Sequence, residues 1–100
     1  MIEREVVFAP EARGDLLALY DWIAERADPL TAMGFIDRLE GFCRRFAHAG
    51  ERGHRRDDIR PGLRIVGFER RATVAFFVGD LAVTILRIFH RGRNWEDESI

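Results

Sequence analysis

Pro61-Gly-Leu-Arg-Ile-Val-Gly-Phe68 contains a clear strand pattern, and so does Arg71-Ala-Thr-Val-Ala-Phe-Phe-Val-Gly-Asp-Leu-Ala-Val-Thr-Ile-Leu-Arg-Ile-Phe-His90 after it. Their apolar, β-branched runs predict three consecutive strands, over residues 63–68, 72–78 and 81–90. Gly79-Asp80 interrupts the longest run with the Gly-first pattern of a two-residue hairpin turn. Strands joined by such short turns pair antiparallel, so the last third of the chain predicts a three-stranded meander.

The predicted turn sets the register of the last hairpin. With Gly79-Asp80 as the turn, the pairs are Val78 with Leu81, Phe76 with Val83, and Val74 with Ile85. This face is large and apolar and is expected to pack on helices. The opposite face is smaller but still mostly apolar, and carries Thr73, Ala75, Phe77, Ala82, Thr84, Leu86, Ile88 and His90. A face exposed to water usually alternates with polar residues, so either a partner or the chain's own tail covers it; the sequence leaves both open.

Upstream of the meander, the sequence predicts a strand and then a helix. Glu3 to Phe8 is a short apolar run that reads as a first strand. Pro10 ends the strand and suits the first turn of a helix that runs to about Ala27. Glu11 and Asp15 place negative charge near the start of this helix, where its dipole favours it. The apolar stripe expected to be buried consists of Leu16, Leu17, Tyr20, Ile23, Ala24 and Ala27.

A second helix follows almost at once. Asp28 is a good N-cap and Pro29 a good first helical residue. Gly50 is the expected C-cap. The apolar stripe of this helix is Ala32, Phe35, Ile36, Leu39, Phe42, Cys43 and Phe46. Two helices joined by so short a link lie antiparallel, as a hairpin.

The element order is therefore β-α-α-β-β-β. It predicts an α+β fold in which a helical hairpin packs on a small, mainly antiparallel sheet. The region from 49 to 62, rich in Gly, Arg and Asp, is expected to be an exposed connection. One hundred residues suit one domain, over residues 1–100.

Composition excludes several classes of function. The net charge is −1, so no overall positive field attracts nucleic acid. All 16 basic residues are Arg, which excludes any mechanism that needs a lysine. The single Cys43 lies in an apolar helical pattern and is expected to be a buried structural residue. With neither a signal peptide nor a membrane-length apolar run, we expect a cytoplasmic protein that does not contact membranes.

A group of basic residues lies near the strand ends. Arg64 begins the second strand, Arg87 lies in the last, and His90, Arg91 and Arg93 follow it; Arg60 comes just before. One interpretation is a basic rim that binds an anion or phosphate. The other is a set of surface charges paired with Asp57, Asp58, Glu69 or Glu96. His90 suits general acid–base catalysis near neutral pH, or a structural hydrogen bond.

No metal or cofactor site is expected. His48 and His54 lack metal-ligand spacing. Asp57-Asp58 would suit a hard cation, but adjacent loop carboxylates are usually only solvated. The chain also has no Gly-rich phosphate motif and no nucleophile elbow.

The chain resembles the RelE/ParE superfamily of bacterial toxins, and its ParE branch in particular. The resemblance rests on Ala9-Pro-Glu-Ala, on Tyr20-Asp-Trp-Ile, on Phe35-Ile-Asp-Arg-Leu, on Arg60-Pro-Gly-Leu-Arg64 and on Ile85-Leu-Arg-Ile-Phe-His-Arg. It implies the toxic component of a type II toxin–antitoxin pair. Its partner would be a ParD-like antitoxin that wraps the toxin's helices and sheet, in a heterotetramer or larger complex.

The superfamily holds two kinds of toxin. RelE-like members are ribosome-dependent messenger RNA endoribonucleases that use lysine, arginine, tyrosine or histidine. ParE-like members lack most of that set and commonly poison DNA gyrase. Here lysine is absent and Tyr20 lies far from the strand ends, which favours a gyrase inhibitor that is not an enzyme. The alternatives are a ribonuclease with Arg64, Arg87 and His90 as catalytic groups, and a non-toxic interaction module on the same fold.

The resemblance and the patterns together assign candidate contact residues. The antitoxin is expected to contact Phe35, Leu39, Phe42, Phe77, Leu86 and Ile88. The target is expected to contact Arg60, Arg64, Arg87, His90, Arg91, Arg93 and Trp95. No sequence-specific binding of nucleic acid by the toxin alone is expected, because there is no overall basic field.

Overall fold

The computed structural model describes residues 3–90, 96 and 100. The elements, in chain order, are β1 (Glu5–Phe8), α1 (Pro10–Arg26), α2 (Pro29–Arg44), a 3₁₀ turn η1 (Arg45–Ala47), β2 (His54–Arg55), β3 (Leu63–Phe68), β4 (Ala72–Val78) and β5 (Ala82–His90). The predicted order of helices and strands is confirmed. The short β2 is an addition, within a region expected to be only a loop.

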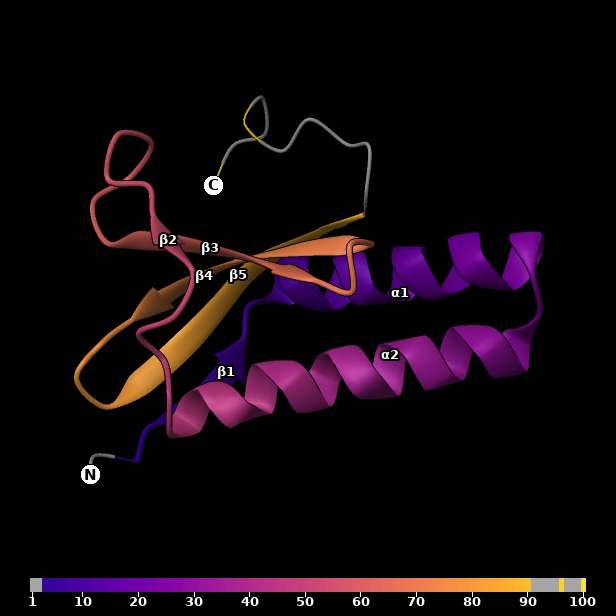
Figure 1. Ribbon diagram of the computed structural model, residues 1–100, viewed down its shortest axis with the longest axis horizontal. Helices are drawn as coiled ribbons and strands as arrows, with labels where there is room; N and C mark the ends of the chain where they lie inside the picture. The colour runs from indigo at the N-terminus through magenta and orange to yellow at the C-terminus, as the bar shows by residue number, and fades with distance from the viewer. Residues whose placement is uncertain (1–2, 91–95, 97–99) are drawn as a thin grey trace.

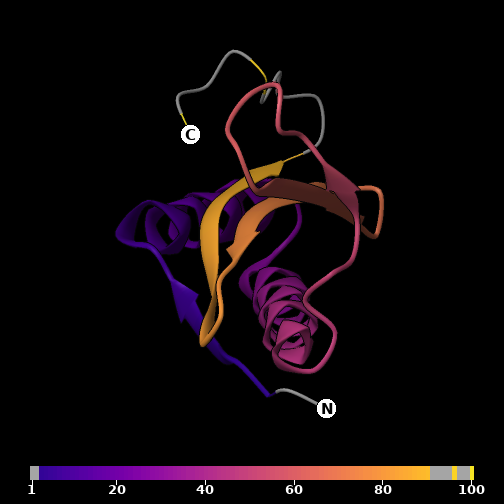
Figure 2. The same ribbon diagram turned by 90° about the vertical axis from the view of Figure 1, so that its left-hand side faces the viewer.

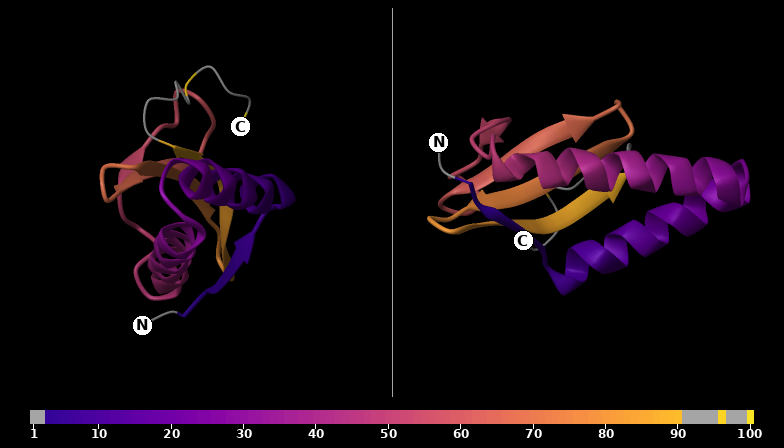
Figure 3. Two further views of the ribbon diagram at one scale, coloured as in Figure 1. Left: turned by 90° about the vertical axis from the view of Figure 1, so that its right-hand side faces the viewer. Right: turned by 90° about the horizontal axis from the view of Figure 1, so that it is seen from below.

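The molecule has two layers. Both helices lie on one face of the sheet, and the segment between β2 and β3 rises on the other (Figures 1 and 2). The sheet order is β1-β5-β4-β3-β2, with β1 parallel to β5 and the other pairs antiparallel. The helical hairpin is longer than the sheet, so the α1–α2 connection projects beyond the sheet's end (Figure 3).

The buried stripe of α1 differs from the predicted one. It consists of Ala12, Leu16, Leu19 and Ile23, a regular spacing of four, three and four residues. Leu17, expected inside, is 69% exposed. The prediction placed the stripe about one residue too far around the helix and so missed Leu19. Neither described helix offers the long apolar stretch that crossing a membrane requires.

The start of α2 is as predicted, but its end is not. Asp28 caps the helix by accepting hydrogen bonds from the Thr31 amide at 2.7 Å and the Thr31 hydroxyl at 2.9 Å. The helix ends at Arg44 and tightens into η1, so Gly50 is not its C-cap. Gly50 is buried, and a Cβ there would lie 3.2 Å from both the Phe46 carbonyl oxygen and a Val83 methyl. A side chain there would press on the core, because the backbone passes close to it.

The β4–β5 register differs from the prediction. Val78 pairs with Val83 and Phe76 with Ile85, so Asp80 and Leu81 form the turn. The Gly79 amide donates to the Ala82 carbonyl at 2.8 Å, which closes the hairpin one residue later than expected. Leu81, predicted to face the helices, is 83% exposed.

A β-bulge then changes which face the end of β5 presents. The register shifts between Ala75 and Phe76, so Leu86 is the extra residue and Val74 pairs with Ile88. Ile88, predicted on the outer face, is 2% exposed in the core under the helices. Phe89 lies instead in the outer cluster and is fully buried. The alternating pattern could not reveal this, because one extra residue reverses the face of every residue after it.

The outer face of the sheet carries a small core of its own. Leu63, Ile65, Ala75 and Phe89 form it, with Ile59, Leu86 and Ile100 packed against them. Ile59 comes from the β2–β3 segment, which Arg56 ties to Glu96 by an ion pair of 2.9 Å. The chain itself therefore covers part of the face, as one of the two open interpretations stated.

Candidate functional site

Of the residues expected to form one basic rim, the described ones, Arg60, Arg64, Arg87 and His90, lie in three separate hollows. Arg64 pairs with Phe76 in β4, whereas His90 pairs with Ala72, four residues along the same strand. At about 3.3 Å per residue, their backbones lie roughly 13 Å apart along the sheet. The structure therefore does not bring Arg64 and His90 together.

Arg87 is held by an acidic side chain of α1. Its Nε and Nη2 donate to the two carboxylate oxygens of Asp15 at 2.8 and 3.0 Å. The side chains are only 19% and 11% exposed for Arg87 and Asp15 respectively. Arg87 also lines a small hollow of about 130 Å³ with Arg60, Leu86 and Ile100. This partner was not among the carboxylates that the sequence suggested.

Arg64 lies in a polar hollow at the β4–β5 turn end of the sheet. The hollow holds about 240 Å³ and brings together Arg4, Arg55 and Arg64. Arg4 donates to the Gly79 carbonyl at 2.9 Å, and Arg55 pairs with Asp57 at 3.2 Å. Glu51 and Asp80 also line the hollow, so acidic groups offset part of its positive charge.

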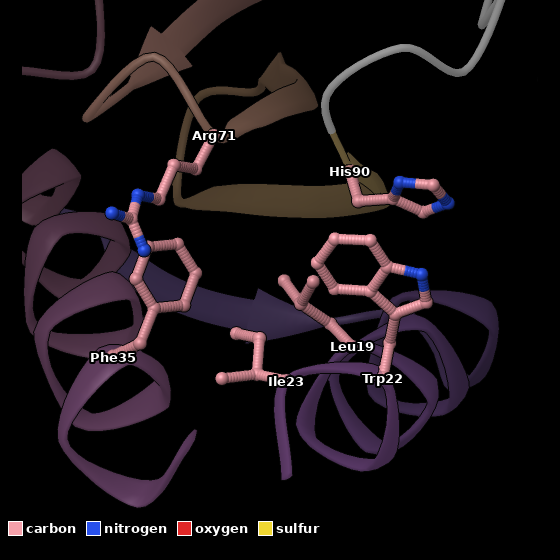
Figure 4. Close-up of a pocket in the computed structure, with 6 residues that line it drawn as sticks. All are labelled: Leu19, Trp22, Ile23, Phe35, Arg71 and His90. Carbon is pink, nitrogen blue, oxygen red and sulfur yellow. The ribbon is translucent and has the colours of Figure 1, made fainter. Parts of the chain in front are cut away.

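His90 stacks on Trp22 at the other end of the sheet. The ring centroids lie 5.3 Å apart with planes at 22°, and the Arg26 guanidinium lies 4.2 Å from the centre of Trp22 (Figure 4 shows the ring pair). The hollow beside them, here called the Trp22 pocket, holds about 280 Å³. Its lining residues are Leu19, Trp22, Ile23, Phe35, Arg71 and His90.

The candidates Arg91, Arg93 and Trp95 lie outside the described residues. Of the remaining basic candidates, Arg60 is exposed. The target-binding assignment of all seven residues therefore stays a prediction.

The residues expected at the antitoxin interface divide by burial. Phe35, Leu39 and Ile88 are 1%, 0% and 2% exposed, so they form the protein's own core and present almost no surface. The prediction took three residues of the α2 stripe as contact residues, and two of them, Phe35 and Leu39, are buried in the core. Phe77 is 38% exposed, and Phe42 and Leu86 are half-buried.

Among the described residues, the Arg56–Asp58 pair and the Cys43 thiol have structural roles. The guanidinium of Arg56 holds Asp58 in a bidentate pair at 2.9 Å, and its hydrogen bonds keep the pKa of Asp58 below the ordinary value. Burial raises the pKa of Cys43 to about 12, so the thiolate needed of a nucleophile is absent at neutral pH. Within residues 3–90, 96 and 100, no cluster of His, Cys, Asp or Glu could hold a metal ion.

Sequence reasoning missed Asp15, Trp22 and Arg71 as organising residues. A signal existed for Asp15, because it lies between Ala12 and Leu19 on the stripe that α1 buries. An acidic side chain on a buried stripe requires a partner. Trp22 and Arg71 gave no such signal, since only the fold brings α1 beside the β3–β4 turn.

Comparisons with known proteins agree with this architecture. The model of a family described as the ParE toxin of the type II toxin–antitoxin system parDE matches residues 6–95. A structure of the chromosomal ParDE system from P. aeruginosa is similar, with 23% identity, a TM-score of 0.78, and coverage of 89% of this chain and 97% of that chain. So is one of the toxin–antitoxin complex RelBE2 from Mycobacterium tuberculosis, at 20% identity, a TM-score of 0.64, and coverage of 93% and 97%. No curated protein sequence matches. At these identities the two structures show the shared fold.

Proposed function

The chain belongs to the ParE toxin family of type II toxin–antitoxin systems, and from this premise we propose that it arrests growth by binding DNA gyrase, without chemistry of its own. A ParD-like antitoxin neutralises it in the cytoplasm, in a heterotetramer or larger complex. The observation that best supports a binding mechanism is that Arg64, Arg87 and His90, the residues a ribonuclease would use, do not converge.

A ribonuclease needs a base at the 2′-hydroxyl and positive charge at the phosphate, all within hydrogen-bond reach of one substrate. His90 lies against Trp22, and Arg87 is bound to Asp15. Arg64 lies roughly 13 Å along the sheet from His90, from the strand spacing. This separation of the three groups supports a binding mechanism over catalysis on one phosphodiester.

We assign target contact to Arg60, which is exposed, and to Arg64, which is half-buried. From the sequence alone we add Arg91, Arg93 and Trp95, which follow β5 along the chain. A variant with Arg91→Gln, Arg93→Gln and Trp95→Ala is expected to lose toxicity while it still binds the antitoxin. Retained toxicity would remove these three residues from the target surface.

Antitoxin contact is assigned to the part of the apolar surface that the toxin leaves open. Phe77 and Leu86 lie on the outer sheet face, and Phe42 lies on the helical side. Because these residues lie on opposite sides of the molecule, one segment that contacts all three must wrap around the sheet. An extended chain that orders on binding suits such a path.

The deciding experiment is inducible expression in bacteria without the neighbouring gene, with growth, DNA breaks and bulk translation followed together. Arrest with DNA breaks and intact translation is expected. An immediate fall in translation would instead indicate a ribonuclease, and no arrest would indicate an interaction module.

The variant His90→Ala separates binding from catalysis. A ribonuclease that uses His90 as its base is expected to lose about 10²-fold or more in rate. A binding toxin keeps most of its potency, because one half-exposed side chain contributes little to a large interface. Immunoblotting for equal protein levels is the control.

A further inference from the structure

The Trp22 pocket lies where α1, α2, the β3–β4 turn and the end of β5 meet (Figure 4). Its floor is apolar: Leu19, Ile23 and Phe35 are 5%, 7% and 1% exposed. Its volume of about 280 Å³ is slightly below the roughly 300–1,000 Å³ typical of small-molecule sites. A hollow of this size and lining suits one large apolar side chain inserted by a partner.

The wall of the pocket is an exposed aromatic group that is already held in place. Trp22 is 41% exposed, yet its ring stacks on His90 and contacts the Arg26 guanidinium. Fixing a tryptophan in this way removes much of the entropy that a contact would otherwise lose. Pre-ordered Trp and Arg side chains around a small hollow are typical of interface hot spots.

The rim of the pocket carries the positive charge of Arg71, which, after the hydrogen bonds from Arg38, also helps to lower the pKa of Glu69. Arg71 is exposed, and its side chain reaches toward the pocket's floor (Figure 4). Among the residues that the structure describes, no Asp or Glu forms an ion pair with Arg71. The nearby Glu69 is taken by Arg38, which donates to its two oxygens at 2.9 and 3.0 Å. Among the described residues no acidic side chain lines the pocket, so these residues present a cation above an apolar floor.

The turn that carries Arg71 is conformationally strained. Glu69 and Arg70 have φ of 51° and 57°, the left-handed region that residues other than glycine rarely adopt. Strained backbone of this kind often marks a functional position. Here it places Arg71 beside the pocket, while the Arg38–Glu69 pair ties the turn to α2.

We propose that the Trp22 pocket is an anchor site for an acidic segment of the antitoxin, which inserts one large apolar side chain and places a neighbouring carboxylate on Arg71. The inference rests on the proposed function, because it requires a neutralising partner. It adds a third contact region, remote from Phe77. Occupation of the pocket also covers His90, so the antitoxin masks a residue expected at the target surface.

The first test compares two neighbouring charge-neutral variants, Arg71→Gln and Arg70→Gln, in full-length toxin co-expressed with the product of the neighbouring gene. Both remove one positive charge from the same turn, but only Arg71 lines the pocket. After separation and refolding of the two proteins, Arg71→Gln is expected to weaken the complex at least about tenfold and Arg70→Gln less than about twofold. The difference is expected to shrink at high salt, since screening weakens an exposed charge pair.

The second test reads the pocket directly through Trp22 fluorescence in a Trp95→Phe toxin, where Trp22 is the remaining tryptophan. Antitoxin binding is expected to shift the Trp22 emission to shorter wavelength and to protect it from acrylamide. If Arg71→Gln and Arg70→Gln bind the antitoxin equally well, and antitoxin binding leaves the quenching of Trp22 unchanged, the anchor site is overturned. The proposed toxin–antitoxin pair would still hold in that case. Protection of Trp22 that rises with the concentration of toxin alone would assign the pocket to a second copy and also overturn the anchor site. A neighbouring-gene product that binds no wild-type toxin would overturn the proposed antitoxin itself.

Discussion

The Asp15 side chain of α1 binds Arg87 of β5 at the edge of the sheet, beyond the end of β1. The β1 strand ends at Phe8, opposite Ile85, and leaves the rest of the β5 edge uncovered. There the Asp15 carboxylate accepts a hydrogen bond from the Ile88 amide at 2.8 Å, as well as two from Arg87. The Asp15 side chain thus gives the Ile88 amide a hydrogen-bond acceptor and attaches α1 to the edge of the sheet.

The variant Asp15→Asn tests this attachment. The amide oxygen can still accept from Ile88, but the Arg87 guanidinium loses its carboxylate in a mostly buried place. We expect the free energy of unfolding to fall by about 1–3 kcal/mol, less than for a fully buried pair because some water contact remains. Urea denaturation measures the change. Asp21→Asn, exposed on the same helix, is expected to stay within about 0.5 kcal/mol; equal losses in both variants would contradict the assignment.

Gly62 is required by the outer sheet face. Its φ is +85°, and a Cβ there would lie 2.6 Å from a ring carbon of Phe77. We expect Gly62→Ala to destabilise the protein by about 1–3 kcal/mol, from backbone strain and displacement of the ring. The matched control is Gly67→Ala in β3, where a Cβ meets nothing within 4 Å. Thermal unfolding measures the midpoints of both variants. Equal decreases for Gly62→Ala and Gly67→Ala would disprove the steric explanation.

The β3–β4 turn offers a stabilising change. Arg70 adopts φ of 57°, which costs an ordinary residue roughly 1–2 kcal/mol and glycine almost nothing. Glycine also loses more conformational entropy on folding, which offsets part of this gain. The net expectation is that Arg70→Gly stabilises the protein by about 0.5–1 kcal/mol. Arg70→Ala removes the same side chain but keeps the Cβ. A gain from the alanine variant as large as from glycine would show that the charge, not the backbone, matters.

Acid is expected to weaken the start of α2. Hydrogen bonds from the Thr31 amide and hydroxyl hold the pKa of Asp28 below its ordinary value of 3.8. Because the pKa of Asp28 is lower in the folded than in the unfolded protein, the charged cap stabilises fully at any pH above the unfolded-state pKa. This stabilisation is lost as the pH falls through the folded-state pKa. The stability difference between wild type and Asp28→Asn should therefore shrink below about pH 4. Chemical denaturation at a series of pH values checks this, with Asp37→Asn as the control for loss of one charge.

Phe77 tests the outer face as an antitoxin surface. We expect Phe77→Asp to weaken the complex, because a carboxylate would be buried without a partner. Leu81→Asp is the matched control, since Leu81 is 83% exposed in the β4–β5 turn. Isothermal titration gives the dissociation constants. An unchanged value for Phe77→Asp would show that this face is not the interface.

Local patterns predicted the fold well but the site poorly. The strand bounds of 63–68 and 72–78, the Asp28 cap and the helical hairpin agree with the structure, since propensity, capping and spacing act over a few residues. The basic residues looked adjacent because they follow one another near strand ends. In the structure Arg64, Arg87 and His90 line three different hollows. Their positions are set by the alternation of side chains along each strand, by the bulge in β5 and by the length of the strands.

The β-α-α-β-β-β order follows from local sequence patterns, since hydrophobic periodicity and turn residues are read within one element at a time. The faces of the strands and the neighbours of the side chains follow from the packing of distant elements. A single bulged residue placed Ile88 under the helices and Phe89 outside, and chain packing brought Asp15 to the edge of β5. The same packing placed Arg71 and Trp22 on opposite sides of one pocket. The Asp15–Ile88 contact joins residues 73 positions apart, which no local pattern encodes. The bulge lies within the β4–β5 hairpin, but alternation of side chains does not reveal an extra residue.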